Sequence, residues 1–128
     1  MKIKMTLFII LLIVSACKTK PTHIETINSD YKITVKQNLN KNIILNGYVK
    51  DKKTFNPIEF ATITLKDNIN NYFTFSDSLG YFEIEIPAEK YNIEIDYLQD
   101  QKITIKDLEL IEYNNYFFSI NLGSTIIY

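Results

Sequence analysis

Four carboxylates stand at alternate positions in two stretches of the chain, where they could do chemistry as a group. They are Glu83, Glu85, Glu94 and Asp96. If the two stretches form paired strands, these outward side chains would make one acidic patch, able to hold a calcium ion or to act as a carboxylate pair. Outward positions of half-buried strands are commonly charged, however, so we expect no metal site and no catalytic residue.

Histidine and cysteine offer little further chemistry. The single histidine, His23, precedes the expected domain, and the single cysteine, Cys17, closes an N-terminal leader pattern. A zinc site, a Ser-His pair and thiol chemistry each need such side chains inside the domain. We therefore expect a protein that is not an enzyme and uses no cofactor.

Tyrosine is abundant, with nine residues. Tyr48 and Tyr81 fall on the outward phase of their expected strands, so they are the preferred candidates for contact with a glycan or a protein partner. A structural interpretation stays open beside this one. Tyrosine forms strands well, and its hydroxyl can reach solvent from a partly buried ring.

The first seventeen residues predict a secretory signal that ends in a lipidation site. Lys2 and Lys4 precede an apolar run that is short for a membrane span, and small residues lead to Cys17. The sequence V-S-A-C resembles the lipobox of bacterial lipoproteins, in which cleavage leaves the cysteine N-terminal and acylated. We therefore expect a signal peptide over residues 1–16 and membrane attachment through Cys17. By analogy with lipoprotein sorting, Lys18 favours the outer membrane, with the domain facing the periplasm or the cell surface.

The charge balance excludes one class of partner. Loss of Lys2 and Lys4 with the leader leaves 12 of the 14 basic residues against 15 acidic ones, a net charge near −3. The chain also contains no arginine. Nucleic-acid binding needs a basic face that displaces counterions from phosphates, so we expect none.

Apolar and polar residues alternate from Ile43 onward, and no stretch has a helical period. The pattern predicts an all-β, seven-stranded, two-sheet sandwich over residues 43–128. Residues 17–42 are expected to be the lipidated cysteine and a tether, with a possible short strand over 31–36 and no predicted structure over 18–29. The expected strands lie near residues 43–50, 61–65, 72–75, 81–86, 91–97, 103–105 and 118–122.

Two motifs run through this region. The first extends from Gly47 to Leu65, the second is Ser76-Asp77-x-x-Gly80-x-Phe82, and Tyr91-x-Ile93-x-Ile95 follows. Together they resemble the carboxypeptidase-regulatory-like domain, a transthyretin-like (prealbumin-like) sandwich of seven strands, and this resemblance implies an Ig-like topology. The motif residues interpreted as structural are Gly47, Val49, Asp51, Thr54, Pro57, Ala61, Asp77, Gly80 and Phe82.

The resemblance implies a non-catalytic role. Such domains are typically appended to metallocarboxypeptidases, to TonB-dependent transporters and to other surface proteins, especially in Bacteroidetes. We expect a membrane-anchored lipoprotein of the cell envelope that serves as an accessory or protein-interaction module, with an envelope protein as partner.

The alternative is a carbohydrate-binding module at the cell surface. A row of exposed aromatic side chains among polar neighbours would favour glycan binding, whereas an apolar edge or patch would favour protein docking. Residues 124–128 would complete the last strand, lie on an open edge, or add to a strand of a partner.

Overall fold

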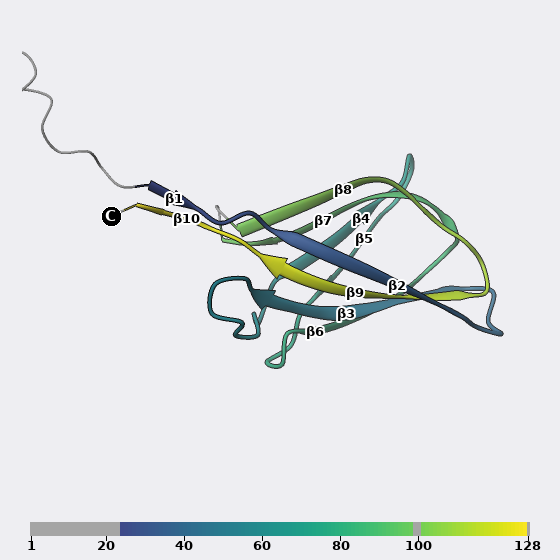
Figure 1. Ribbon diagram of the computed structural model, residues 1–128. Coiled ribbons are helices and arrows are strands. Elements are labelled where there is room, and N and C mark those ends of the chain that lie inside the picture. The colour runs from purple at the N-terminus through teal and green to yellow at the C-terminus, as the bar shows by residue number, and fades with distance from the viewer. Residues whose placement is uncertain (1–23, 99–100, 128) are drawn as a thin grey trace, which may run out of the picture.

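The alternation of apolar and polar residues produces strands throughout the computed structural model, which describes residues 24–98 and 101–127. Two four-stranded sheets pack against each other (Figure 1). Sheet I has the order β2 (Asp30–Gln37), β9 (Asn114–Leu122), β3 (Ile43–Asp51) and β6 (Tyr81–Ile86). Sheet II has the order β5 (Asn71–Phe75), β4 (Thr62–Lys66), β7 (Glu89–Tyr97) and β8 (Gln101–Leu110).

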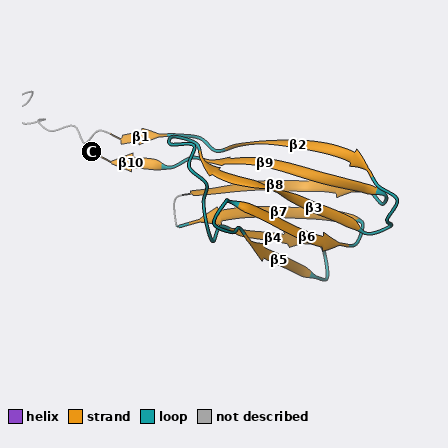
Figure 2. Ribbon diagram, turned by 90° about the horizontal axis from the view of Figure 1, so that it is seen from below, coloured by secondary structure: helices purple, strands orange, loops and turns teal. Residues whose placement is uncertain are grey.

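A short two-stranded ribbon, β1 (Ile24–Thr26) with β10 (Thr125–Ile127), projects from one end of the sandwich (Figures 1 and 2). Its strands pair antiparallel, with Ile24 opposite Ile127. The ribbon joins the sandwich through Ser29, whose hydroxyl accepts a hydrogen bond from the backbone N–H of Gly123 at 2.8 Å. Residues 125–127 therefore pair within the chain.

The pairing of β3 with β9 is the parallel one in sheet I, and it places Gly47 opposite Phe118. A β-carbon built on Gly47 would overlap the Phe118 carbonyl oxygen and approach the Phe118 β-carbon. Gly47 faces the interior, where it leaves room for the fully buried ring of Phe118. The glycine is thus required for close approach of two strands that are far apart in sequence.

The core lies between the two sheets and consists of the inward residues of both. Tyr91 is the largest fully buried side chain. Its hydroxyl donates a hydrogen bond to the Pro87 carbonyl at 2.7 Å, and burial raises the pKa of Tyr91 to about 12. The other core residues are Ile43, Leu45, Val49, Ile58, Ala61, Ile63, Leu65, Phe82, Ile86, Ile93, Ile95, Ile105, Leu110, Tyr116, Phe118, Ile120 and Leu122.

The predicted all-β two-sheet sandwich is confirmed, with two differences at its N-terminal side. The possible strand over 31–36 is β2, an eight-residue edge strand that pairs with β9, so sheet I includes residues placed in the expected tether. No structure was predicted over residues 18–29, and this prediction was wrong at Ile24–Thr26, which forms β1. A three-residue strand is too short to show a period, and its partner lies at the other end of the chain.

Replacement of Gly47 by alanine should destabilise the fold, because the new methyl group would push β3 away from β9. We expect a loss of about 1–3 kcal/mol in the free energy of unfolding, in the range of overpacked cores. Urea unfolding measures it. Lys36→Ala, at an exposed position on edge strand β2, is the control and should stay within about 0.5 kcal/mol of wild type. Equal stability of the two variants would contradict the close-approach role of Gly47.

Candidate functional site

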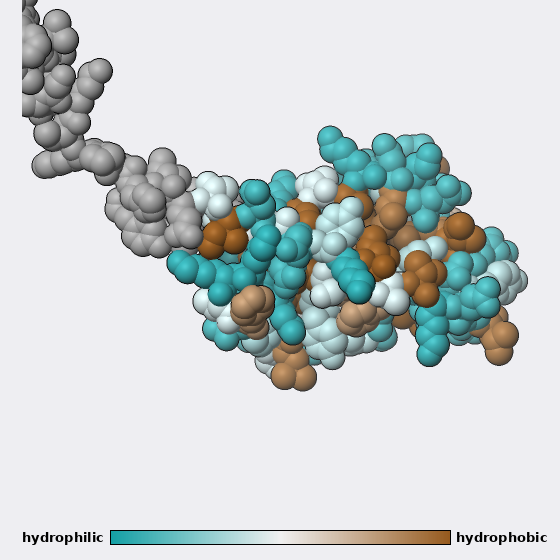
Figure 3. Space-filling view, viewed as in Figure 1, coloured by the Kyte–Doolittle hydropathy of each residue, from teal (hydrophilic) through white to brown (hydrophobic). Residues whose placement is uncertain are grey.

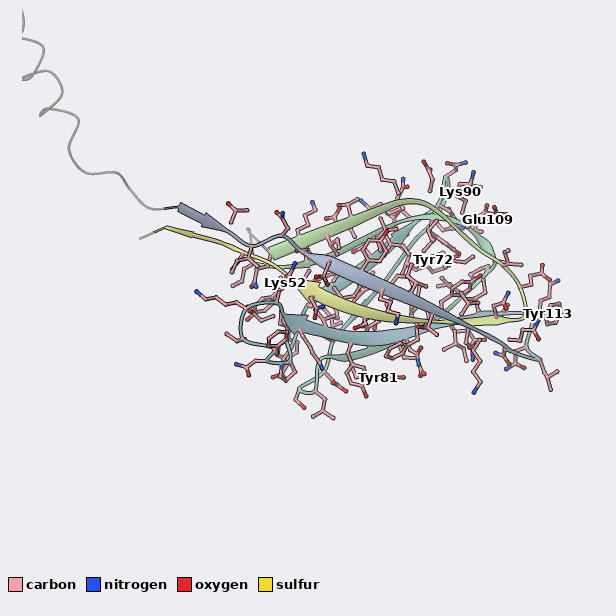
Figure 4. All side chains as sticks on the ribbon, in the orientation of Figure 1. Lys52, Tyr72, Tyr81, Lys90, Glu109 and Tyr113 are labelled. Atoms are coloured by element: carbon pink, nitrogen blue, oxygen red, sulfur yellow. The ribbon has the colours of Figure 1, made fainter. Side chains whose placement is uncertain are left out.

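Three aromatic side chains form a row across the outer face of sheet I. Tyr81 on β6 and Tyr48 on β3 are register partners, with ring centroids 5.3 Å apart. Tyr48 also lies 6.1 Å from Phe117 on β9, in an edge-to-face arrangement. Tyr48 and Phe117 are each 37% exposed, and the Tyr81 side chain points away from the sandwich (Figure 4). We call Tyr81, Tyr48 and Phe117 the aromatic row.

Polar side chains border the row and are already oriented by hydrogen bonds. The Asn46 amide donates to the Tyr81 hydroxyl at 3.4 Å, and that hydroxyl donates to Glu83 at 3.0 Å. The Asn46 contact favours the phenolate. Burial and the neighbouring Glu83 carboxylate outweigh it, so the pKa of Tyr81 is raised. The hydroxyl therefore stays protonated and available as a donor or an acceptor at neutral pH.

Uncharged polar groups continue on the other side of the row. Ser119 on β9 lies opposite Tyr48, and Thr34 on β2 lies opposite Phe117. The face thus carries flat aromatic rings among short hydroxyl and amide side chains, with the Glu83 carboxylate on one side and Lys32, opposite Ser119, on the other. Such a surface can stack on the apolar face of a sugar ring while hydrogen-bonding its hydroxyls.

Tyr48 and Tyr81 were predicted from the sequence as contact residues, whereas Phe117 was not. The available signal was the alternation of β9, in which Phe118, Ile120 and Leu122 point inward and Phe117 consequently points outward. Recognising Phe117 as part of a row also required knowing that β9 lies beside β3. That pairing joins residues about seventy positions apart, and no local pattern predicts it.

The four carboxylates do not form one acidic patch, because the two strands that carry them do not pair. Glu83 and Glu85 lie on β6 in sheet I, whereas Glu94 and Asp96 lie on β7 in sheet II. Glu94 instead forms an ion pair with Lys102 at 3.0 Å. Within residues 24–98 and 101–127, no group of three or more His, Cys, Asp or Glu side chains could hold a metal ion.

Asp51 organises the loop that connects β3 to β4. Its Oδ1 accepts hydrogen bonds from the backbone N–H groups of Lys53 at 2.9 Å and Thr54 at 3.0 Å, and its Oδ2 accepts one from the Gln101 amide at 3.1 Å. Burial alone would raise its pKa, but these hydrogen bonds outweigh burial and lower the pKa of Asp51. Pro57 follows in a bridge to Lys50. The first motif thus shapes this loop.

Asp77 and Gly80 shape the turn between β5 and β6. Asp77 Oδ1 accepts hydrogen bonds from the backbone N–H groups of Leu79 and Tyr81, and Gly80 has a φ of 77°. The preceding Ser76, which opens the second motif but was not among the residues interpreted as structural, is buried. Its hydroxyl donates to the Ile58 carbonyl at 2.6 Å and accepts from the Ala61 N–H at 2.9 Å, so it ties the two motifs together.

Clefts are found at both ends of the sandwich. One of about 450 Å³ is bordered by Asp51, Phe60, Tyr97 and Gln101. Two others, of about 550 and 530 Å³, share Tyr113 at the opposite end from Lys52 (Figure 4). Apolar patches interrupt a mostly polar surface in Figure 3. The aromatic row differs from the clefts in being an open face.

The predicted lipidation residue Cys17 and the leader lie outside the described residues. In the part of the chain that the structure describes, no helix is long and apolar enough to cross a membrane.

No family model matches the chain, and no curated protein matches it. The resemblance to the carboxypeptidase-regulatory-like domain therefore stays a prediction. The fold is similar to a solved structure described as a "putative carbohydrate binding protein from Bacteroides uniformis ATCC 8492". The sequences are 9% identical and the TM-score is 0.49. The similar region covers 62% of this chain and 40% of that protein, so the chain spans less than half of its length.

Asp51→Asn should destabilise the protein at neutral pH and matter less in acid. A carboxylate whose folded pKa lies below its usual 3.8 contributes stability above that value, and the contribution is lost as the pH falls through the folded pKa. Urea unfolding near pH 7 and near pH 3 should show the gap between variant and wild type shrinking in acid. Glu112→Gln is an exposed control, and its difference from wild type in the free energy of unfolding should be the same at both pH values. A gap independent of pH would contradict the loop role of the ionised Asp51.

Proposed function

We propose that this chain is a lipid-anchored, non-catalytic lipoprotein of the bacterial outer membrane that binds carbohydrate on the outer face of sheet I. One observation carries the carbohydrate part of the proposal. The aromatic row crosses three neighbouring strands, β6, β3 and β9, with Asn46, Glu83 and Ser119 around it. This is the arrangement that distinguishes a glycan face from an apolar docking patch.

The angles within the row favour a particular kind of glycan. The ring plane of Tyr48 is tilted by 59° from that of Tyr81 and by 61° from that of Phe117. Three rings tilted in this way cannot lie flat together against a planar crystalline surface. They suit a soluble, twisted oligosaccharide whose successive sugars present their faces at different angles.

The attachment part of the proposal follows from the leader and Cys17, with the domain facing the periplasm or the cell surface. A domain held at a membrane by acyl chains can concentrate a glycan there without catalysing a reaction.

A second candidate function, docking of an envelope protein, is favoured by β5. This edge strand of sheet II carries no charged residue, whereas the edge strands β2, β6 and β8 all do. Phe73 and Phe75 on β5 are 63% and 52% exposed, with ring centroids 5.8 Å apart. An uncharged edge with high strand propensity can accept a strand from a partner.

Tyr48→Ala and Phe117→Ala should each weaken glycan binding by about tenfold or more, about 1.4 kcal/mol, since each removes a ring from the centre of the face. A glycan array identifies the oligosaccharide, and titration calorimetry measures the affinities. Phe73→Ala removes an exposed ring from the other sheet and is the matched control.

Glycan binding that survives both substitutions, or that Phe73→Ala weakens equally, would contradict the proposed site. Absence of any glycan ligand for the wild type would contradict carbohydrate binding itself. Loss of a cross-linked envelope protein only in Phe73→Ala would favour the second candidate.

A further inference from the structure

Three large apolar residues stand at loop positions where neither burial nor backbone geometry explains them. Phe55 and Phe60 lie between β3 and β4, and Leu98 follows β7. Their φ angles are 62°, 62° and 59°, in the left-handed region that residues with a branched or bulky side chain rarely adopt, and Tyr113 at the opposite end of the sandwich shares this region with a φ of 65°. Their side chains are 70%, 69% and 69% exposed. Glycine or asparagine would suit such turns better. We therefore infer that these exposed apolar side chains contact something outside the domain.

These three positions, which we call the apolar tips, belong to one end of the sandwich. The cleft of about 450 Å³ is bordered by Phe60 from one loop and by Tyr97, the neighbour of Leu98, from the other. Phe55 is held in the same loop by a hydrogen bond from its N–H to the Asp51 carbonyl at 2.8 Å. Phe60 thus borders the cleft itself, while Phe55 and Leu98 each adjoin a residue that does.

The same end is where the N-terminal ribbon leaves the sandwich, as Figures 1 and 2 show. Lys52, in the loop of Phe55, forms an ion pair with Asp30 at the start of β2 at 3.0 Å. The Ser29 hydroxyl, one residue earlier, donates to the Lys102 carbonyl at the start of β8 at 3.3 Å. The polypeptide that runs through β1 therefore joins the sandwich beside the apolar tips.

The distance to the predicted anchor is short. Cys17 and Ile24 are separated by residues 18–23, and an extended chain of this length spans at most about 25 Å. A bilayer that holds Cys17 must therefore lie near the ribbon end of the sandwich.

We propose that Phe55, Phe60 and Leu98 insert into the interface of the bilayer to which Cys17 anchors the chain. This inference rests on the lipid anchoring proposed above and adds an orientation to it. The ribbon end faces the membrane, the end with Tyr113 points away, and the aromatic row on the side of the sandwich stays open to solvent. Apolar side chains at loop tips are suited to such shallow insertion.

The absence of tryptophan from the chain gives a direct test. Phe55→Trp and Phe60→Trp each introduce a single fluorophore at a tip, and Phe73→Trp places one on exposed β5 as the matched control. The mature acylated protein, from Cys17 onward, is reconstituted into phosphatidylcholine vesicles with and without brominated acyl chains. We expect brominated lipid to reduce the emission of both tip variants about twofold or more, with a blue shift, and to leave Phe73→Trp unchanged.

The outcomes separate this inference from the proposals that it builds on. Vesicle-bound protein whose tip variants are quenched no more than Phe73→Trp would overturn the insertion and leave the anchor intact. A blue shift without bromine quenching would overturn it in favour of a protein covering the tips. Chain that mass spectrometry shows to lack acylation would overturn the anchor and, with it, the insertion. None of these results bears on glycan binding to the aromatic row.

Discussion

Sheet I and the aromatic row both require the close approach of β3 and β9 at Gly47. Because Gly47 has no side chain, the backbone of Phe118 can lie against it and the Phe118 ring can fill the core beneath. The register that follows places Asn46 beside Phe117 and Tyr48 beside Ser119 on the opposite face. One glycine on the inner face thereby sets the aromatic row on the outer face.

Much of the fold was predictable because the period of a strand is a local property. Ile43, Leu45 and Val49 alternate with outward residues, and β3 begins and ends within one residue of its expected limits. Sheet membership is not local. Glu83 and Glu94 belong to strands that are consecutive in sequence but lie in different sheets, and this overturned the predicted acidic patch.

The candidate site was predictable only in part for the same reason. Tyr48 and Tyr81 could be assigned to outward phases, but Phe117 joins them through a pairing between distant strands. The left-handed φ of Phe55 and Phe60 had no sequence signal, since glycine normally marks such positions. The sequence thus predicts which face of a strand each side chain occupies. It does not predict which strands pair or which backbone angles are strained.

Chemical-shift mapping would show whether the aromatic row is a glycan-binding face. Amide NMR spectra of isotope-labelled protein would be recorded during titration with an oligosaccharide selected on an array. If the row binds the oligosaccharide, the largest shifts fall on residues that are neighbours on sheet I, namely Asn46, Tyr48, Tyr81, Phe117 and Ser119. Shifts concentrated on Phe73 and Phe75, or around Tyr113, with none on β3 and β9, would contradict binding at the row.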